Sequence, residues 1–279
     1  MNFITKTNLS TTCDFGAQMF EYAALYAIGK ITNHTPVFIK ETITERWAFP
    51  IGEPFIHCPK IINYSDVPPD NFYQYDVQVS DYTIDNNIKY LNSENNWVIN
   101  GGIGMYEYFH TYRNEILKLF TFKESIQLFC QEYINKLKEN NEILVSMHFR
   151  RGDYLLYSSL NLSLEYYNAA IRKINELFPN KKVKYLIFSN EIEWVKENYK
   201  NDAFIYVEHL NRFQDMCLMS MCDHNIIANS CFSWWGAYLN NNEHKQVIAP
   251  YYYVSDDVNK SLNLNGRYYP KEWITLHEK

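Results

Sequence analysis

The stretch EILVSMHFRRGDY, residues 142–154, decides the fold. Its first part is rich in β-branched and apolar residues, which predicts a buried strand, and polar residues follow directly. Arg150 and Arg151 stand side by side where this strand ends. Two adjacent guanidinium groups repel each other unless an anion or neighbouring carboxylates balance their charge. The stretch therefore predicts a strand and, at its end, a site for an anion.

Strands and helices alternate after this stretch. The sequence predicts strands over 183–190, 203–208, 224–230 and 245–253, and helices over 163–178, 213–222 and 233–240. Ser163 is the expected N-cap of the first of these helices, and Glu165 lies in its first turn. Strict alternation of strand and helix implies a parallel, doubly wound sheet. We therefore expect a Rossmann-type domain over residues 141–279.

The first half of the chain is less regular. Helical periodicity predicts helices over 14–30, 107–120 and 123–140, and TPVFIKE (35–41) is typical of a short strand. Residues 50–100 are irregular, with strand-like pieces such as NWVIN at their end. The break at Asn140 and Asn141 marks the expected end of an N-terminal domain, residues 1–140.

Composition narrows the classes of function. Hydrophobic residues make up 47% of the 279 residues, enough for a substantial core, and the 24 Tyr and 6 Trp add rings that fill the core or stack on ligands. The net charge of −6 and pI of about 5.8 disfavour a general nucleic-acid binder. No run of about 18 apolar residues encodes a membrane span. The N-terminus lacks the basic and apolar segments of a secretory signal, so we expect a cytoplasmic protein.

The cysteines predict buried thiols rather than a metal site. Cys217, Cys222, His224 and Cys231 cluster in the sequence, but zinc ligands normally come in tight C-x2-C pairs, which this spacing does not match. The six cysteines also lack the spacing of a small disulfide scaffold.

Three stretches meet at one edge of the predicted sheet: 148–154, 189–190 and 229–233. Ligands of such sheets bind beyond the carboxyl ends of the strands. An arginine there can grip a phosphate through two parallel charge-assisted bonds, with Asp153 to orient it. By strand alternation, His148 points to the same side as Arg150. The alternative is a surface ion pair between Arg151 and Asp153.

A diphosphate at this edge would be held by side chains and by amides at a helix N-terminus. The Gly-rich fingerprint of dinucleotide enzymes and the P-loop motif are both absent, as is the G-x-S-x-G motif of serine hydrolases. Asn229, Ser230 and Ser233 lie between a strand and a helix, where hydroxyls and amides can meet phosphate oxygens. The alternative is simple helix capping by Ser230 or Ser233.

Several motifs resemble those of one family, the α-1,2-fucosyltransferases of glycosyltransferase family 11. HFRRGDY (148–154) is similar to the family's H-x-R-R-G-D-Y motif, and FSNEIEWVKEN (188–198) is similar to its F-S-D-D-x-x-W segment. MSMCDHNIIANSCFSWWGAYLN (219–240) closely resembles its third motif, and FGAQMFEYAALYAIGK (15–30) resembles its N-terminal one. The resemblance runs in collinear order over nearly the whole chain.

The resemblance implies an α/β, GT-B-like fold of two Rossmann-type domains, with the GDP-sugar-binding parallel sheet in 141–279 and the acceptor side in 1–140. It implies an inverting transfer of L-fucose from GDP-β-L-fucose to a galactose hydroxyl of a glycan, in α-1,2 linkage and without a metal cofactor. The implied partners are a nucleotide sugar and a galactose-containing glycan; no nucleic acid is implied. A lipid-linked acceptor would bring a peripheral membrane contact.

The resemblance also assigns roles to individual residues. Arg150 is the implied ligand of the β-phosphate, with support from Arg151 and Asp153. The base that deprotonates the acceptor is not assigned, and Glu21, Asp14 and His110 are its candidates. The expected catalytic residues are Arg150, Asp153 and Glu21, and the expected donor-binding residues are His148, Arg150, Arg151, Asn190, Asn229, Ser230, Phe232, Ser233, Gly16 and Gln18.

Two positions depart from the family pattern. Ala17 stands where the family has an asparagine that could touch donor or acceptor, and Asn190 stands for an aspartate, which removes a charge near the nucleotide edge. These departures leave two alternatives open. One is a related transferase with another deoxysugar donor or linkage, and the other is a non-catalytic nucleotide- or glycan-binding relative.

Overall fold

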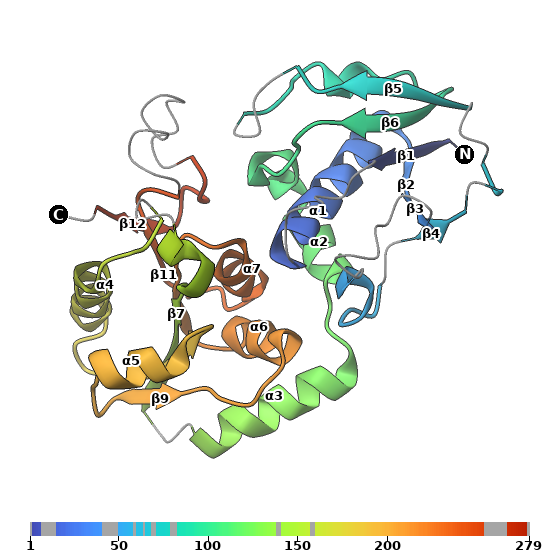
Figure 1. Cartoon of the computed structure of the whole chain (residues 1–279). Helices are drawn as coiled ribbons and strands as arrows, with labels where there is room; N and C mark the ends of the chain where they lie inside the picture. Colours follow the sequence, from blue (N-terminus) through green and yellow to red (C-terminus); the bar gives the residue numbers. More distant parts are fainter. Residues whose placement is uncertain are drawn as a thin grey trace. The chain divides into compact units, whose positions relative to one another are not determined.

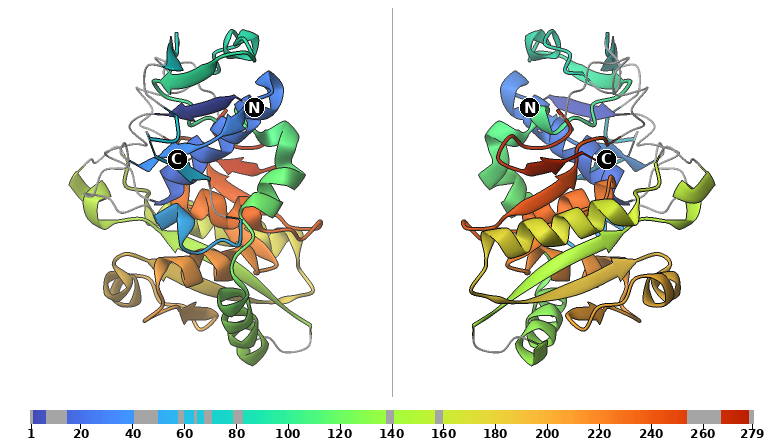
Figure 2. Two further views of the ribbon diagram at one scale, coloured as in Figure 1. Left: turned by 90° about the vertical axis from the view of Figure 1, so that its right-hand side faces the viewer. Right: turned by 90° about the vertical axis from the view of Figure 1, so that its left-hand side faces the viewer.

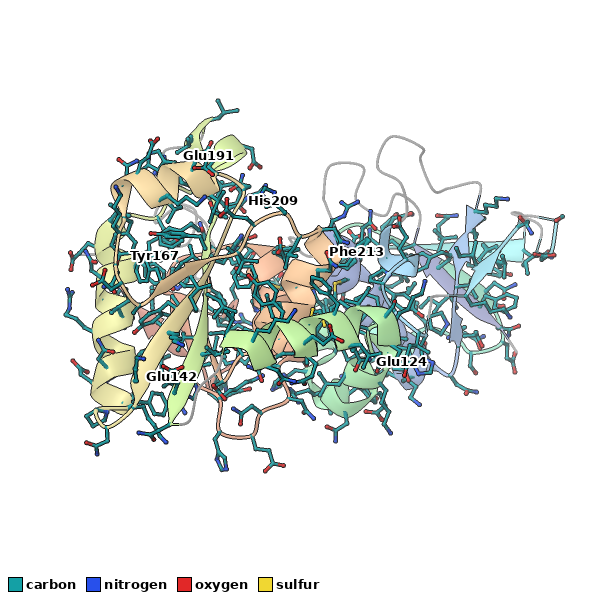
Figure 3. All side chains as sticks on the ribbon, turned by 90° about the horizontal axis from the view of Figure 1, so that it is seen from below. Glu124, Glu142, Tyr167, Glu191, His209 and Phe213 are labelled. Carbon is teal, nitrogen blue, oxygen red and sulfur yellow. The ribbon has the colours of Figure 1, made fainter. Side chains whose placement is uncertain are left out.

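The structure, a computed structural model, describes residues 2–6, 15–40, 50–57, 60–63, 65–67, 71–78, 83–137, 141–156, 160–253 and 267–277. The chain divides into two compact units, Met1–Lys123 and Glu124–Lys279. The division lies before helix α3 (Glu124–Leu137) and not after it, where the sequence analysis placed it. The reason is that α3 packs against helix α6 of the second unit, as Figure 3 shows.

The second unit contains a six-stranded sheet in the order β12-β11-β10-β7-β8-β9, and all of its strands are parallel (Figure 1). Its strands are β7 (Glu142–Phe149), β8 (Lys182–Ser189), β9 (Phe204–Tyr206), β10 (His224–Ile226), β11 (Val247–Pro250) and β12 (Ile274–Leu276). The predicted strands correspond to β7 to β11, whereas the three-residue β12 was not predicted. The predicted parallel, doubly wound sheet is confirmed.

Helices cover both faces of this sheet. Helices α4 and α5 lie on one face, and α6 and α7 lie on the other (Figures 1 and 2). Their bounds are α4 (Leu164–Leu177), α5 (Ile192–Asn198), α6 (Arg212–Ser220) and α7 (Cys231–Leu239). Ser163 caps α4 as predicted, because its Oγ accepts a hydrogen bond from the Tyr166 amide at 3.4 Å. Strands covered on both faces are apolar almost throughout, which explains the run of buried residues in β7.

The strand order places a topological switch point beside β7. The chain runs from β7 to β8 and β9 on one side, and then returns to place β10 against the other side of β7. A crevice forms where neighbouring connections leave in opposite directions, at the carboxyl ends of the strands. In this sheet the switch point lies between β7 and β10, so a ligand is expected beyond the carboxyl ends of these two strands. We call this part of the second unit the carboxyl edge.

The first unit contains a smaller parallel sheet in the order β2-β1-β6-β5 and a separate pair, β3-β4. Its strands are β1 (Phe3–Lys6), β2 (Thr35–Pro36), β3 (Phe38–Ile39), β4 (Ile61–Ile62), β5 (Phe72–Asp76) and β6 (Asn96–Asn100), and its α-helices are α1 (Phe15–Thr32) and α2 (Arg113–Leu119). Within the described ranges, no helix is both long and apolar enough to cross a membrane.

The helix predicted over 107–120 is shorter than expected. Two 3₁₀ turns, Tyr106–Tyr108 and His110–Tyr112, precede α2, which begins at Arg113. A 3₁₀-helix has three residues per turn, so Tyr106 and Phe109 lie on the same side of the backbone. Both side chains are buried. Periodicity alone does not separate this tight local winding from the first turns of an α-helix.

Candidate functional site

Arg150 follows β7 directly and lies at the carboxyl edge. Its Nη2 pairs with Asp153 Oδ1 at 2.7 Å, and its guanidinium carbon lies 5.2 Å from the centre of the Tyr154 ring. Its Nε is buried and has no hydrogen-bond partner within the described part of the chain. A buried N–H of a charged group that lacks an acceptor costs free energy. An anion that accepts a hydrogen bond from this N–H would remove that cost. Asp153 thus pairs with Arg150, and the alternative pair of Asp153 with Arg151 is not found within the described residues.

Arg151 turns away from its neighbour. Its Nε donates to Glu191 Oε2 at 3.1 Å, and its guanidinium carbon lies 3.3 Å from the centre of the Trp194 ring. The side chain is 13% exposed. A guanidinium stacked on an aromatic ring and paired with a carboxylate is held firmly by its own surroundings. The two arginines therefore differ in role: Arg150 has an unused donor, and Arg151 anchors the turn.

His148 lies in the last part of β7 and is buried. Its ring centre lies 5.8 Å from that of Phe232, and its Nδ1 has no hydrogen-bond partner among the residues described. Burial, together with the nearby charge of Arg150, lowers the pKa of His148 to about 3. The imidazole is therefore neutral at physiological pH, and it can exchange a hydrogen bond with a ligand without adding charge.

The depressed pKa of His148 predicts a specific loss of stability in acid. The unfolded chain takes up this proton near pH 6.5, and the folded protein does so only near pH 3, so protons favour unfolding between these values. The stabilising contribution is present above about pH 6.5 and is lost as the pH falls. Between about pH 7 and about pH 5, we expect wild type to lose about 2 kcal/mol of unfolding free energy relative to His148→Phe, measured by urea denaturation. Parallel losses in both proteins would contradict this account.

Residues 229–233 form the other wall of the carboxyl edge. Ser230 caps α7, because its Oγ accepts from the Phe232 amide at 3.3 Å. The Oγ of Ser233 accepts from the Ala228 amide at 3.2 Å, and the residue is only 1% exposed. Both hydroxyls are thus engaged within the chain, as the capping alternative predicted. The phosphate contacts assigned to them remain predictions.

Asn229 differs from the two serines. Its Nδ2 donates to the backbone carbonyl oxygens of Leu160 at 3.0 Å and Tyr253 at 3.3 Å. Its backbone carbonyl oxygen accepts from the Tyr154 hydroxyl at 3.1 Å. Its Oδ1 is buried without a hydrogen-bond partner in the described ranges. Asn229 therefore ties the turn after β7 to the start of α7 and keeps one acceptor unused.

Unused polar atoms gather at the carboxyl edge. Buried polar groups in proteins are nearly always hydrogen-bonded, so a cluster of exceptions indicates a binding site. Five buried side-chain atoms without a partner among the described residues belong to segments that meet here: His148 Nδ1, Arg150 Nε, Asn161 Oδ1, Asn229 Oδ1 and the Tyr269 hydroxyl. Together they present donors and acceptors of the kinds that a phosphorylated, hydroxyl-rich ligand can satisfy.

Asn161 and Tyr269 were not predicted from the sequence. Asn161 follows the residue whose carbonyl binds Asn229, and Tyr269 lies close enough to Tyr154 and Cys231 to interact with them electrostatically. Burial raises the pKa of Tyr269 well above its ordinary value. An asparagine in a loop and a tyrosine among many carry no signal of their own in the sequence.

Asp215 was also missed. It lies in the first turn of α6, which follows β9, the outermost strand on the β8 side of the sheet. Burial raises the pKa of its carboxyl group to about 7, and we find no hydrogen bond or ion pair to that group within the described residues. Acidic residues are common in the first turn of a helix, so the sequence gives no sign that Asp215 is buried.

The predicted residues of the first unit lie on or near α1. Gln18 is buried, and its Oε1 has no hydrogen-bond partner among the residues that the structure describes. Glu21 lies 3.8 Å from Lys6 Nζ, which also donates to the Gly101 carbonyl at 2.6 Å. Gly16 is buried in the first turn of α1. Asp14 lies outside the described residues.

The Cys and His cluster has other contacts. Cys222 Sγ donates to the Leu218 carbonyl, His224 Nδ1 accepts from the Gln246 amide, and Cys231 Sγ lies 2.8 Å from the Tyr253 hydroxyl. Within the described residues, no three or more His, Cys, Asp or Glu side chains are arranged to hold a metal ion. His110 contacts the edge of the Tyr106 ring.

Comparison with known sequences gives a consistent result. The model of Glycosyl transferase family 11 matches residues 3–277. The O-antigen biosynthesis glycosyltransferase WbnK of Escherichia coli is 30% identical over 195 residues, which cover 64% of this chain and 62% of that protein. An alpha-1,2-colitosyltransferase of Escherichia coli is 36% identical over 154 residues, 51% of each protein. The galactoside alpha-(1,2)-fucosyltransferase 2 of Oryctolagus cuniculus is 26% identical over 82% of this chain and 65% of its own length. The chain thus spans less than two thirds of each of these curated relatives.

Comparison with solved structures shows the fold. The fucosyltransferase NodZ from Bradyrhizobium matches with a TM-score of 0.55 at 15% identity, over 84% of this chain and 92% of that one. POFUT1 in complex with GDP-fucose matches with a TM-score of 0.56 at 11% identity, over 88% and 96%. The predicted α/β, GT-B-like fold is confirmed.

Proposed function

The chain belongs to glycosyl transferase family 11, and from this premise we propose that it transfers L-fucose from GDP-β-L-fucose to a galactose hydroxyl of a glycan, in α-1,2 linkage and with inversion. The observation that carries the proposal is the unpaired, buried Nε of Arg150 at the switch point of a Rossmann-type sheet. The names of the relatives, an alpha-1,2-colitosyltransferase and a galactoside alpha-(1,2)-fucosyltransferase, support the reaction class and the linkage.

The proposed chemistry follows from charge. The acceptor oxygen attacks the anomeric carbon from the face opposite the diphosphate, a new C–O bond forms, and the bond to the β-phosphate oxygen breaks. The departing GDP takes the electron pair, and a base takes the acceptor proton. Negative charge therefore grows on the diphosphate in the transition state, where a guanidinium stabilises it more than in the ground state. Arg150 supplies that charge, and Asp153 orients it through the 2.7 Å contact.

The other residues at the carboxyl edge complete the donor site in this proposal. Neutral His148 and the free Oδ1 of Asn229 form hydrogen bonds with the nucleotide sugar. Glu21, whose carboxylate lies 3.8 Å from Lys6 Nζ, is the proposed base. Gly16 and Gln18 keep the donor-binding role that the family resemblance implies for them.

One experiment separates the main alternatives. The purified full chain is incubated with GDP-fucose and a panel of β-galactosides, and GDP release and product mass are followed together. The expected result is GDP release that depends on a galactoside, with a product heavier by one deoxyhexose and a linkage identified by NMR. GDP binding without turnover on any acceptor would contradict the enzyme proposal and favour a binding protein.

A second donor is tested in the same assay. The identity to an alpha-1,2-colitosyltransferase favours GDP-colitose as an alternative donor. Because a site that hydrogen-bonds a hydroxyl strongly rejects a substrate lacking it, the two donors should differ clearly in kcat/KM. Preference for GDP-colitose would keep the reaction class and change the sugar.

We also propose that the transfer needs no divalent metal, because Arg150 supplies the positive charge at the diphosphate. Activity is therefore expected to remain within about twofold of its starting value in excess EDTA. The measurement is the initial rate before and after dialysis against the chelator. Loss of activity that Mg²⁺ or Mn²⁺ restores would contradict the arginine-based account.

A further inference from the structure

We propose that Asn190 is a positioning residue for Arg150: its carboxamide fixes the peptide group of Arg151 and thereby the direction in which the Arg150 guanidinium points. The inference rests on the proposed function, since it takes Arg150 as the ligand of the leaving diphosphate. This role of Asn190 differs from the lost charge and the donor contact that the sequence predicted.

Two hydrogen bonds join Asn190 to the backbone of Arg151. The Arg151 amide donates to Asn190 Oδ1 at 2.9 Å, and Asn190 Nδ2 donates to the Arg151 carbonyl oxygen at 3.2 Å. The parallel pairing of β7 and β8 ends with Phe149 opposite Ser189, one residue before Asn190. The Asn190 side chain therefore continues the ladder by one step beyond the last backbone pair.

This contact requires an amide. An aspartate at 190 could accept from the Arg151 amide, but it has no N–H for the Arg151 carbonyl, and its second oxygen would face that carbonyl at close range. Asn190 thus suits the local backbone, although the family pattern has an aspartate there.

Gly152 supports the same conclusion independently. Its φ of +63° lies in the left-handed region, and a Cβ at this position would lie 2.5 Å from Asn190 Nδ2. A residue with a side chain would be strained there and would displace the carboxamide. We call the contacts of residues 190–194 with Arg151 the clasp. Gly152 leaves room for the clasp because it has no side chain.

The clasp acts on Arg151 and leaves Arg150 available. Besides the two bonds of Asn190, it contains the ion pair of Glu191 with Arg151 and the stacking of Trp194 on its guanidinium. Figure 3 shows Glu191 at the end of the second unit opposite Glu142, which begins β7. The contacts of Arg150 described above run instead to Asp153 and Tyr154. Because misplacing a catalytic group by about 1 Å can cost about 100-fold in rate, a shift of the Arg151 peptide is felt at Arg150.

A double-mutant cycle tests this coupling. GDP affinity is measured by isothermal titration calorimetry on the full chain for wild type, Asn190→Asp, Arg150→Ala and the double variant. We expect Asn190→Asp alone to weaken GDP binding about tenfold, and to change it less than about twofold when Arg150 is already alanine. Asn201→Asp is the matched control, because exposed Asn201 uses only its Oδ1 within the described part of the chain. This oxygen accepts from the Ala203 amide, and an aspartate keeps that bond.

The outcomes separate the two proposals. If Asn190→Asp weakens GDP binding equally in both backgrounds, Asn190 touches the nucleotide itself and the positioning role is wrong. If it binds GDP as tightly as Asn201→Asp, the clasp does not position Arg150 and the inference is also wrong. If Arg150→Ala leaves GDP affinity unchanged, the diphosphate assignment of the proposed function fails first. Asn190→Ala, which removes both bonds, should repeat the coupling seen with Asn190→Asp.

Discussion

The Arg150→Ala variant is expected to lose about 1,000-fold in kcat/KM for sugar transfer while it remains folded. In the proposed reaction the guanidinium binds the leaving diphosphate, and its Nε has no other partner in the described residues. Removing one preorganised donor from a site of developing charge usually costs about 100- to 1,000-fold. Its partly exposed pair with Asp153 contributes about 1 kcal/mol to stability. The measurements are steady-state kinetics with GDP-fucose and thermal unfolding.

Two variants control this result. Arg172→Ala removes the same side chain from an exposed ion pair with Glu165 on α4 and should leave kcat/KM within about twofold of wild type. Arg150→Lys keeps the charge but not the fork of donors, and it should retain part of the activity. If Arg150→Ala keeps kcat/KM within about threefold of wild type, the diphosphate is held elsewhere.

The Gly236→Ala variant is expected to lower the free energy of unfolding by about 2–3 kcal/mol. Gly236 is buried on α7 where that helix packs against α6. An added Cβ would lie 2.8 Å from the Cβ of Met219 and 3.0 Å from its Sδ. The Cβ of Met219 cannot rotate away, so the helices must separate or the neighbouring side chains must move. Urea denaturation at equilibrium measures the difference.

Gly104→Ala is the matched control for this substitution. A Cβ at Gly104 would meet no heavy atom within 4 Å, so the same added methyl group should change the unfolding free energy by less than about 0.5 kcal/mol. Equal losses at both positions would mean that packing between α6 and α7 does not set the cost.

The second unit could be predicted from the sequence because its signals are long and regular. Buried parallel strands such as β7 appear as nearly continuous apolar runs, and the Ser163 cap marks the start of α4. In the first unit, one short strand was predicted over 35–41, where the structure has β2 and β3 with two residues each. The two-residue strand β4 carries too little pattern to be recognised. The strand β12 was missed for the same reason.

The candidate site was predicted only in part. Position along the chain identified the carboxyl edge, since the ends of parallel strands meet there whatever the side chains do. The sequence does not show which way each side chain turns. Nothing in the sequence distinguishes Arg150 from Arg151. Arg151 is the anchor because it contacts Trp194 and Glu191, and Glu191 lies 40 positions away in the chain. The burial of Asp215 and Tyr269 likewise depends on distant segments.

The switch point beside β7 has a consequence for how the protein folds. One side of β7 pairs with β8, but its other side pairs with β10, and the bond between Asn225 and Ser146 joins residues 79 positions apart. Contacts between such distant positions must overcome a large loss of chain entropy before they stabilise anything, so sheets of this kind form slowly. During synthesis, β7 stays half-paired until β10 has left the ribosome. The carboxyl edge is therefore complete only after β7 has gained its second neighbour.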